Sequence, residues 1–282
     1  FQMKVYLIFY FIVGVSSTFT PHFEAYLKQH YGDGFDTQMT RSDMGFGVMG
    51  SFGGKQTEND VIERQPVIFV HGVTLRAGVF TGHIQYFHRA GYHMAELYGT
   101  TYGDGGITPM FSKAMECEDV KQIRKFIEAV TSYTNSTVDI IAYSMGVAIS
   151  RKAILGGHCV DTNEDLGEPL TGLVDTFVAV GGVSYGLENC PTFTKACNTV
   201  NGMICGSKYL VDVNSVKARY EGSYSFVIYS TNDQIVGQNC CGHQCSELDF
   251  ADGTSKHRFL NHGTVLTTTK EIQLKMIQNH IF

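Results

Sequence analysis

The chain has 282 residues, which is enough for one large domain or two small ones. Hydrophobic residues make up 43% of the sequence, so the chain can bury a substantial core. Its formal net charge of −6, without a basic cluster, argues against a nucleic-acid-binding protein.

Residues 1–17 have the pattern of a secretory signal peptide. Lys4 precedes an apolar run over residues 5–15, and the small residues Ser16 and Ser17 follow it. The run is too short for an ordinary transmembrane helix, and an uncleaved anchor is the alternative. We therefore expect a secreted, extracellular protein in which residues 18–282 form a single domain.

Eight cysteines follow this segment, and an even number of cysteines in a secreted chain indicates disulfides. They are Cys117, Cys159, Cys190, Cys197, Cys205, Cys240, Cys241 and Cys245. A metal site is the alternative for the cluster around His243, but adjacent cysteines lack the usual spacing of metal ligands. We expect disulfides of undetermined connectivity and no metal. The only glycosylation sequon begins at Asn135, at the end of a predicted helix.

Along the rest of the chain, short apolar runs alternate with segments whose apolar residues have helical spacing. Strands are predicted at residues 66–70, 93–98, 138–142, 174–180 and 224–229. Helices are predicted at residues 83–90, 117–133, 145–155 and 266–279. Little regular structure is expected at residues 32–60, and residues 183–222 are expected to form a long connection. The alternation predicts a mostly parallel sheet with helices on both faces, whose ligand sites lie outside the carboxyl ends of the strands.

Ser144 lies in a tight turn between the predicted strand at 138–142 and the predicted helix at 145–155. A serine hydroxyl becomes a nucleophile when it is held exposed next to a base and an oxyanion site. The small residues Ala142 and Gly146 let the strand and the helix approach each other. This arrangement resembles the nucleophile turn of the α/β-hydrolases, so Ser144 is the candidate nucleophile.

The literal Gly-x-Ser-x-Gly pattern surrounds Ser184 instead. It also follows a predicted strand, but residues 187–191 have the composition of a loop. Because no helix begins there to offer backbone N–H groups to an oxyanion, Ser184 is the weaker candidate.

A serine nucleophile needs a base and an acid that orients the base, and in α/β-hydrolases the acid precedes the histidine. His262 precedes the last predicted helix, and Asp233 follows the strand at 224–229, so we select these two. The weaker alternatives are His158, His243, His257 and His280 for the base, and Asp175, Asp249 and Asp252 for the acid. The expected oxyanion donors are the backbone N–H groups of Val73 and Met145.

Five segments together resemble the class 2 lipases, which are small α/β-hydrolases related to minimal bacterial lipases, with many secreted nematode members. They are residues 67–72, 142–146, 179–182, 230–236 and 261–263. The resemblance covers roughly residues 65–280. It implies an α/β-hydrolase fold and hydrolysis of carboxylic esters, often acylglycerols, by a Ser144–His262–Asp233 triad. It implies no cofactor and no obligate protein partner, but a lipid or small ester substrate and transient contact with a lipid–water interface.

Two departures from the family pattern affect what can be expected of the substrate. Tyr143 precedes the candidate nucleophile where many relatives have histidine, and residues 18–60 and 183–222 are additional. The 183–222 segment is either a lid or a disulfide-stapled insertion. An amidase and a non-catalytic secreted binding protein on a hydrolase scaffold are the alternative functions.

Overall fold

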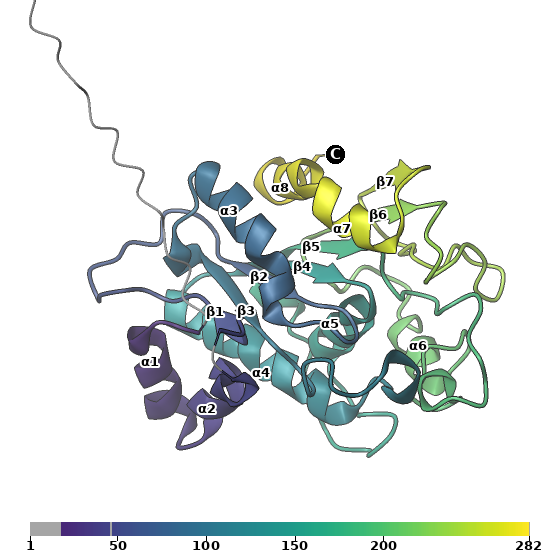
Figure 1. Ribbon diagram of the computed structural model, residues 1–282, viewed down its shortest axis with the longest axis horizontal. Helices are drawn as coiled ribbons and strands as arrows, with labels where there is room; N and C mark the ends of the chain where they lie inside the picture. The colour runs from purple at the N-terminus through teal and green to yellow at the C-terminus, as the bar shows by residue number, and fades with distance from the viewer. Residues whose placement is uncertain (1–17, 46, 282) are drawn as a thin grey trace, which may run out of the picture.

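The structure is a computed structural model that describes residues 18–45 and 47–281. The predicted signal peptide lies outside the described residues. One seven-stranded sheet crosses the molecule in the order β1-β3-β2-β4-β5-β6-β7 (Figure 1). The strands are β1 Ser51–Phe52, β2 Val67–Val70, β3 Leu97–Thr100, β4 Val138–Tyr143, β5 Val174–Val180, β6 Tyr224–Ser230 and β7 Gly253–His257. Only the pairing of β1 with β3 is antiparallel, so the predicted mostly parallel sheet is confirmed.

Helices cover both faces of the sheet, as predicted. The helices are α1 Pro21–Tyr31, α2 Phe35–Thr40, α3 Thr81–Arg89, α4 Cys117–Thr134, α5 Met145–Leu155, α6 Lys208–Val213, α7 His262–Thr268 and α8 Lys270–Asn279. One apolar core lies under α1, α4 and α5, and a second lies under α3, α7 and α8 (Figure 1). Because both faces are covered, the central strands β2 and β4 are buried along their whole length. The continuous apolar run of β2 anticipates this burial, whereas β4 includes one buried charged residue, Asp139.

Four short elements were not predicted, and the predicted strand at 93–98 was partly wrong. The strand begins only at Leu97, after a 3-10 turn at Met94–Glu96. The four elements are β1, α2, α6 and β7, and they have at most six residues each. Strand β7 has the polar sequence Gly-Thr-Ser-Lys-His and lies at the edge of the sheet, where one side of the strand needs no apolar partner.

The predicted closing helix is divided into two. Helix α7 starts earlier than predicted, at His262, and ends at Thr268, and α8 starts at Lys270. The side chain of Gln273 donates to the carbonyl of Leu266 across the break, at 3.0 Å. The earlier start matters because it places the candidate base in the first turn of a helix.

All eight cysteines form disulfides, as predicted. The pairs are Cys117–Cys159, Cys190–Cys197, Cys205–Cys241 and Cys240–Cys245. The three cysteines around His243 are therefore not available as thiolate ligands, which removes the metal-site alternative. Among the described helices, none is both long and apolar enough to cross a membrane.

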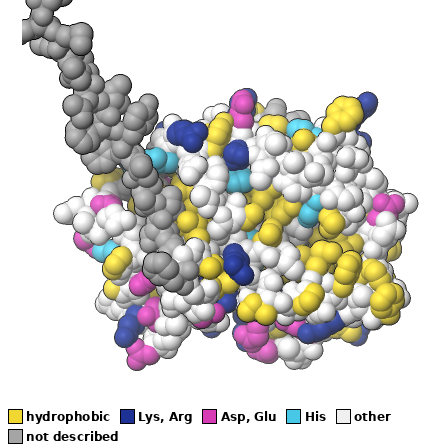
Figure 2. All heavy atoms as spheres, in the orientation of Figure 1, with side chains coloured by type: hydrophobic (Ala, Val, Ile, Leu, Met, Phe, Trp, Pro, Cys, Tyr) yellow, Lys and Arg dark blue, Asp and Glu magenta, His cyan; other side chains and the backbone are white. Residues whose placement is uncertain are grey.

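The two additional segments pack against the rest of the domain. In the N-terminal segment, Phe19 and Phe23 are buried, and the ring of Phe19 stacks on Phe126 of α4. In residues 183–222, several apolar side chains join the core under α5, among them Val183, Leu187, Met203 and Leu210. Phe193 is an exception, with 91% of its surface exposed. Hydrophobic side chains are also visible on the surface around α6, in the right half of Figure 2.

Candidate active site

Ser144 occupies a strained turn at the carboxyl end of β4. Its φ of 56° and ψ of −126° lie outside the conformations that residues with a side chain usually adopt. The turn is held by neighbouring backbone, because Ser144 N–H donates to the carbonyl of Val180 at 3.0 Å. A Cβ atom on Gly72 would lie 2.8 Å from the Cβ of Ser144, and one on Gly146 would lie 2.3 Å from the carbonyl of His71. Only glycine therefore allows β2, β4 and α5 to meet this closely.

The three side chains selected from the sequence lie in one hydrogen-bonded series. Nε2 of His262 lies 3.0 Å from Oγ of Ser144, and its Nδ1 lies 2.7 Å from Oδ2 of Asp233. They come from three strand ends, because Ser144 follows β4, Asp233 follows β6 and His262 comes after β7. The Asp233 side chain is 1% exposed and that of His262 is 12% exposed, so solvent reaches the series mainly from the histidine side.

The carboxylate of Asp233 has one oxygen for the backbone and one for the histidine. Oδ1 accepts hydrogen bonds from the N–H groups of Ile235 and Val236, at 2.9 and 3.0 Å. The other oxygen, Oδ2, therefore faces Nδ1 of His262 as an acceptor. A carboxylate at this position favours the tautomer with hydrogen on Nδ1, which leaves Nε2 able to accept the proton of Ser144.

The backbone of His262 is held on both sides, which sequence reasoning did not detect. Its N–H donates to Oε1 of Gln234 at 3.2 Å, and its carbonyl accepts from the hydroxyl of Tyr143 at 2.9 Å. Asn261 and Thr264 cap the first turn of α7 reciprocally. Gln234 and Tyr143 are the immediate sequence neighbours of the candidate acid and nucleophile, and that position was the only signal that could have found them.

The loop after β2 carries the first expected oxyanion donor. Val73 and Met145 line one cavity together with His71, Tyr102 and Lys113. Within the described part of the chain, neither the Val73 N–H nor the Met145 N–H has a hydrogen-bond acceptor. Met145 follows Ser144 directly, and Val73 follows Gly72, whose backbone lies against the Ser144 side chain.

A buried histidine orients the peptide that includes the Val73 N–H. Nδ1 of His71 donates to the carbonyl of Gly72 at 2.8 Å, and Nε2 accepts from the N–H of Tyr102 at 3.1 Å. The imidazole of His71 also stacks on the ring of Tyr102, with the ring centroids 4.2 Å apart. Burial lowers the pKa of His71 to about 4, so this imidazole is neutral at physiological pH. In the trans peptide between Gly72 and Val73, the N–H points away from the carbonyl that His71 holds.

The competing residues are engaged elsewhere. Ser184 is buried, and its hydroxyl donates to the carbonyl of Ser246 at 3.2 Å. His243 stacks on Tyr185, and His280 pairs with Asp175 at 3.2 Å. The remaining alternatives also have partners other than Ser144. The side chain of His257 hydrogen-bonds to Ser255, and that of Asp249 to Tyr185. Asp252 forms an ion pair with Arg219, and the backbone of His158 forms a β-bridge with Asp165. None of them contacts the Ser144 series.

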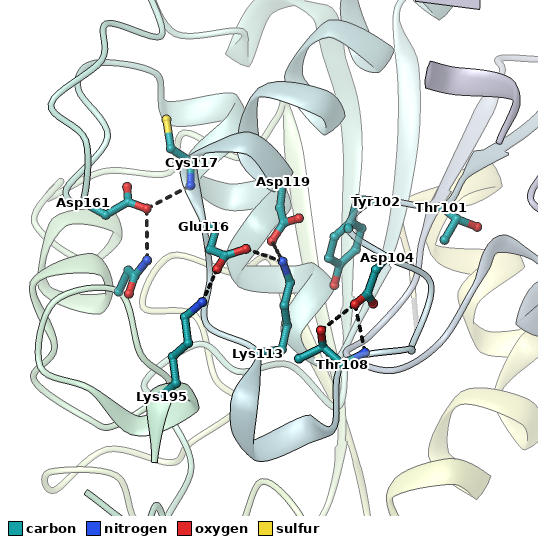
Figure 3. A network of polar contacts seen from close by, with 12 residues as sticks. Thr101, Tyr102, Asp104, Thr108, Lys113, Glu116, Cys117, Asp119, Asp161 and Lys195 are labelled. Atoms are coloured by element: carbon teal, nitrogen blue, oxygen red, sulfur yellow. Dashed lines mark hydrogen bonds and ion pairs between the residues drawn. The ribbon is translucent and has the colours of Figure 1, made fainter. Parts of the chain in front are cut away.

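A second polar cluster borders the same cavity (Figure 3). Nζ of Lys113 lies 2.6 Å from a carboxylate oxygen of Glu116 and 2.8 Å from one of Asp119. Glu116 also pairs with Lys195 of the 183–222 segment, at 2.7 Å. Burial raises the pKa of Asp119. Burial alone would lower the pKa of Lys113, but the two carboxylates outweigh it and raise that pKa.

Asn135 ends helix α4 and lies on the surface. It adopts a left-handed conformation with φ of 50°, and its side chain is exposed. The sequon is therefore accessible to a glycan.

The family model of the class 2 lipases matches residues 64–275 of the chain. This match includes Ser144, Asp233, His262, Val73 and Met145, and the segment at 18–60 lies outside it. A search of curated proteins found no match.

Solved structures with similar folds include two lipases. Lipase B of Aspergillus fumigatus is 15% identical with a TM-score of 0.52, and the match covers 74% of this chain and 48% of that one. The mature form of the Bacillus licheniformis lipase BlEst2 is 13% identical with a TM-score of 0.53, covering 80% and 96%. At such identities the likeness concerns the fold, and the chain has the α/β-hydrolase fold.

Proposed function

Since the chain belongs to the class 2 lipase family, we propose that it is a secreted hydrolase of carboxylic esters that acts on acylglycerol-type lipids. The observation that carries the proposal is the continuous series from Oγ of Ser144 through His262 to Asp233, at 3.0 and 2.7 Å. Nucleophile, base and orienting acid within hydrogen-bond reach are what acyl transfer by a serine requires.

In the proposed reaction, Oγ of Ser144 attacks the ester carbonyl carbon while Nε2 of His262 takes the hydroxyl proton. The tetrahedral intermediate collapses, the bond to the alcohol oxygen breaks, and the alcohol leaves with the proton from His262. A water molecule then attacks the acyl-enzyme, again giving a proton to His262. Release of the carboxylic acid returns that proton to Ser144. Asp233 keeps the imidazole in the required tautomer throughout.

The proposed oxyanion donors are the N–H groups of Val73 and Met145. Both lack an acceptor among the described residues, so they are available to the negative oxygen of the intermediate. Loss of one such donor typically costs about 10²–10³ in rate. Because the donors belong to the backbone, substituting either side chain would test their role poorly.

The first test is labelling with a fluorescent fluorophosphonate, which reacts with an activated serine. We expect the wild type to be labelled and Ser144→Ala to lose labelling. Ser184→Ala is the matched control, because Ser184 carries the literal motif yet hydrogen-bonds to the Ser246 carbonyl. Labelling that survives in Ser144→Ala would remove Ser144 from the mechanism. A folded wild type without labelling would favour the non-catalytic binding protein.

The substrate class is tested by comparing a glycerol ester with the amide of the same acyl chain. The proposed function requires that the ester is hydrolysed with a much higher kcat/KM than the amide. Hydrolysis of the amide at a comparable kcat/KM would instead favour an amidase.

Secretion is proposed from the eight cysteines, all of which are oxidised in the described structure. The test is expression in a secreting eukaryotic cell, followed by N-terminal sequencing of the protein in the medium. Cleavage after Ser17 is expected, with a glycan on Asn135 that a glycosidase removes. Protein retained in the cell with residues 1–17 attached would favour the uncleaved anchor.

Residues 183–222 are proposed to be a disulfide-stapled insertion instead of a lid. The Cys190–Cys197 disulfide, the Cys205–Cys241 disulfide and the burial of Leu187 and Leu210 support this. A lid that opens at a lipid surface would give an abrupt rise in rate when the substrate exceeds its solubility. We expect no such rise, and observing one would favour the lid.

A further inference from the structure

Tyr143 connects the strand that carries Ser144 to the helix that carries His262. It is the last residue of β4, and its hydroxyl donates to the carbonyl of His262 at 2.9 Å. The side chain is buried, with 3% of the residue exposed. Among the described residues, Tyr143 and Gln234 are the side chains that hydrogen-bond to the backbone of His262.

The ring of Tyr143 also packs against the imidazole. The two ring centroids are 5.0 Å apart and the planes are tilted by 30°. Cδ1 of Tyr143 would lie 3.2 Å from a Cβ on Gly72, so the ring also lies close to the Gly72 backbone. The hydroxyl thus restricts the backbone of the histidine, and the ring restricts its side chain.

We propose that Tyr143 is a positioning residue that sets the distance between Nε2 of His262 and Oγ of Ser144. This inference rests on the proposed function, because it concerns the same series of side chains. The hydroxyl fixes the carbonyl of His262, while Gln234 accepts the N–H of the same residue at 3.2 Å. The first residue of α7 is therefore held from both sides of its Cα, and the imidazole is aimed at Ser144.

The ring has a second role in this proposal. When Ser144 attacks the substrate, His262 gains a proton and becomes positive. An aromatic ring within about 6 Å of a cation attracts it through the negative face of the ring. The ring centroid of Tyr143 lies 5.0 Å from that of His262, so the ring is placed to attract the positive charge that forms on the imidazole during the reaction.

The test uses Tyr143→Phe, which removes only the hydroxyl, and Tyr98→Phe as the matched control. Tyr98 is also buried, and its hydroxyl also donates to a backbone carbonyl, that of Ala95, at 2.6 Å. Steady-state kinetics on a soluble ester and thermal unfolding are measured for both variants. We expect Tyr143→Phe to lower kcat about 3- to 10-fold with KM unchanged within twofold, and Tyr98→Phe to leave kcat unchanged.

Two results would overturn the proposal. If Tyr143→Phe keeps the wild-type kcat and only unfolds at a lower temperature, as Tyr98→Phe does, its hydroxyl is merely structural. If KM rises while kcat is unchanged, Tyr143 contacts the substrate and does not position the base.

Tyr143→Leu separates the ring from the hydroxyl. We expect kcat to fall about threefold further than in Tyr143→Phe, because the ring that faces the imidazolium is lost. Equal kcat values in the two variants would contradict the role of the ring.

Failure of the proposed function gives a different pattern of results. In that case the wild type hydrolyses no ester, or Ser144→Ala hydrolyses it as well as the wild type. The Tyr143 experiment is interpreted only when the wild type is active and Ser144→Ala is not.

Discussion

Two polar clusters lie near the Val73 and Met145 backbone, and they differ in how their charges are used. The Ser144 series holds one carboxylate and no permanent cation. Its hydrogen bonds run in one line, from Oγ of Ser144 to Nε2 of His262 and from Nδ1 of His262 to Oδ2 of Asp233. The Lys113 cluster holds two cations and two carboxylates that largely satisfy one another. The comparison teaches that a high density of charge does not identify a reactive site, because paired charges have little capacity left for a substrate.

The clusters also differ in what holds them. Ser144 and His262 are held by close glycine contacts and by hydrogen bonds to main-chain atoms, which keep Ser144 in its strained conformation. Lys113, Glu116 and Lys195 are held by ion pairs between side chains, which join the 183–222 segment to the start of α4 (Figure 3). We therefore expect mutations in the first cluster to affect rate and mutations in the second to affect stability.

The largest expected effect is that of Ser144→Ala on turnover. Ester hydrolysis should fall by at least about 10⁴-fold, because the nucleophile is lost while the oxyanion donors remain. The free energy of unfolding should stay within about 0.5 kcal/mol of the wild type. The measurements are kcat/KM on a soluble ester and urea unfolding. If turnover fell less than tenfold, the expectation that mutations in the Ser144 series affect rate would be wrong.

Asp233→Asn should reduce kcat by about 10²–10⁴-fold without unfolding the protein. The amide oxygen can still accept from Ile235 and Val236, so the NH₂ group would face Nδ1 of His262. That arrangement favours the tautomer with hydrogen on Nε2, which cannot take the proton of Ser144. A kcat near the wild-type value would show that the carboxylate does not orient the base.

His71 provides a pH test of the first cluster. Its pKa is about 4 in the folded protein, against 6.5 without burial. As the pH falls from 6.5 to about 4, the unfolded chain takes up a proton that the folded protein refuses. The contribution of His71 to the free energy of unfolding should therefore decrease by up to about 3 kcal/mol over this window, and His71 should cause no further loss below it.

The measurement is urea unfolding between pH 7 and pH 4 for the wild type and His71→Asn. The variant lacks the titrating group, so its loss of stability over this window should be smaller. His93→Asn is the control, because His93 is exposed. Equal slopes for the wild type and His71→Asn would contradict the neutral, buried imidazole beside the oxyanion loop.

Lys113→Met should affect stability and leave the chemistry almost unchanged. We expect the free energy of unfolding to fall by about 1–3 kcal/mol, because two carboxylates lose their shared cation. Burial already raises the pKa of Asp119, so this carboxyl can take up a proton when the cation is absent. Stability of Lys113→Met should therefore fall as the pH rises through the raised pKa of Asp119.

Adding Asp119→Asn to Lys113→Met should recover part of the lost stability, because the buried carboxyl is then neutral at every pH. The kcat of both variants should stay within about twofold of the wild type. A kcat loss comparable to that of Asp233→Asn would mean that the Lys113 cluster takes part in the reaction.

Much of the central sheet could be predicted because its residues are selected by burial alone. The runs at Val67–Val70 and Phe177–Val180 are apolar throughout, and only a strand covered on both faces needs such runs. The turn at Ser144 could be predicted because a strand, small residues and a helix follow one another within a few residues. The candidate acid and base could be selected from their order along the chain, although the sequence provides no distance between them.

Other features could not be predicted because they depend on residues that are far apart in the sequence. The polar strand β7 exists because β6 provides its partner, and the four disulfides depend on which loops meet. Tyr143 and His262 are 119 positions apart, so no local pattern relates them.

By itself, the sequence determined the alternation of strands and helices, the candidate nucleophile and the presence of disulfides. These properties are local, since periodicity, small residues and cysteine count are read within one segment or from the composition. The tertiary structure alone decided the pairing of the cysteines, the neutral state of His71 and the contacts that hold His262 against Ser144. These depend on burial and on distances of about 3 Å between segments, which only the folded chain brings together.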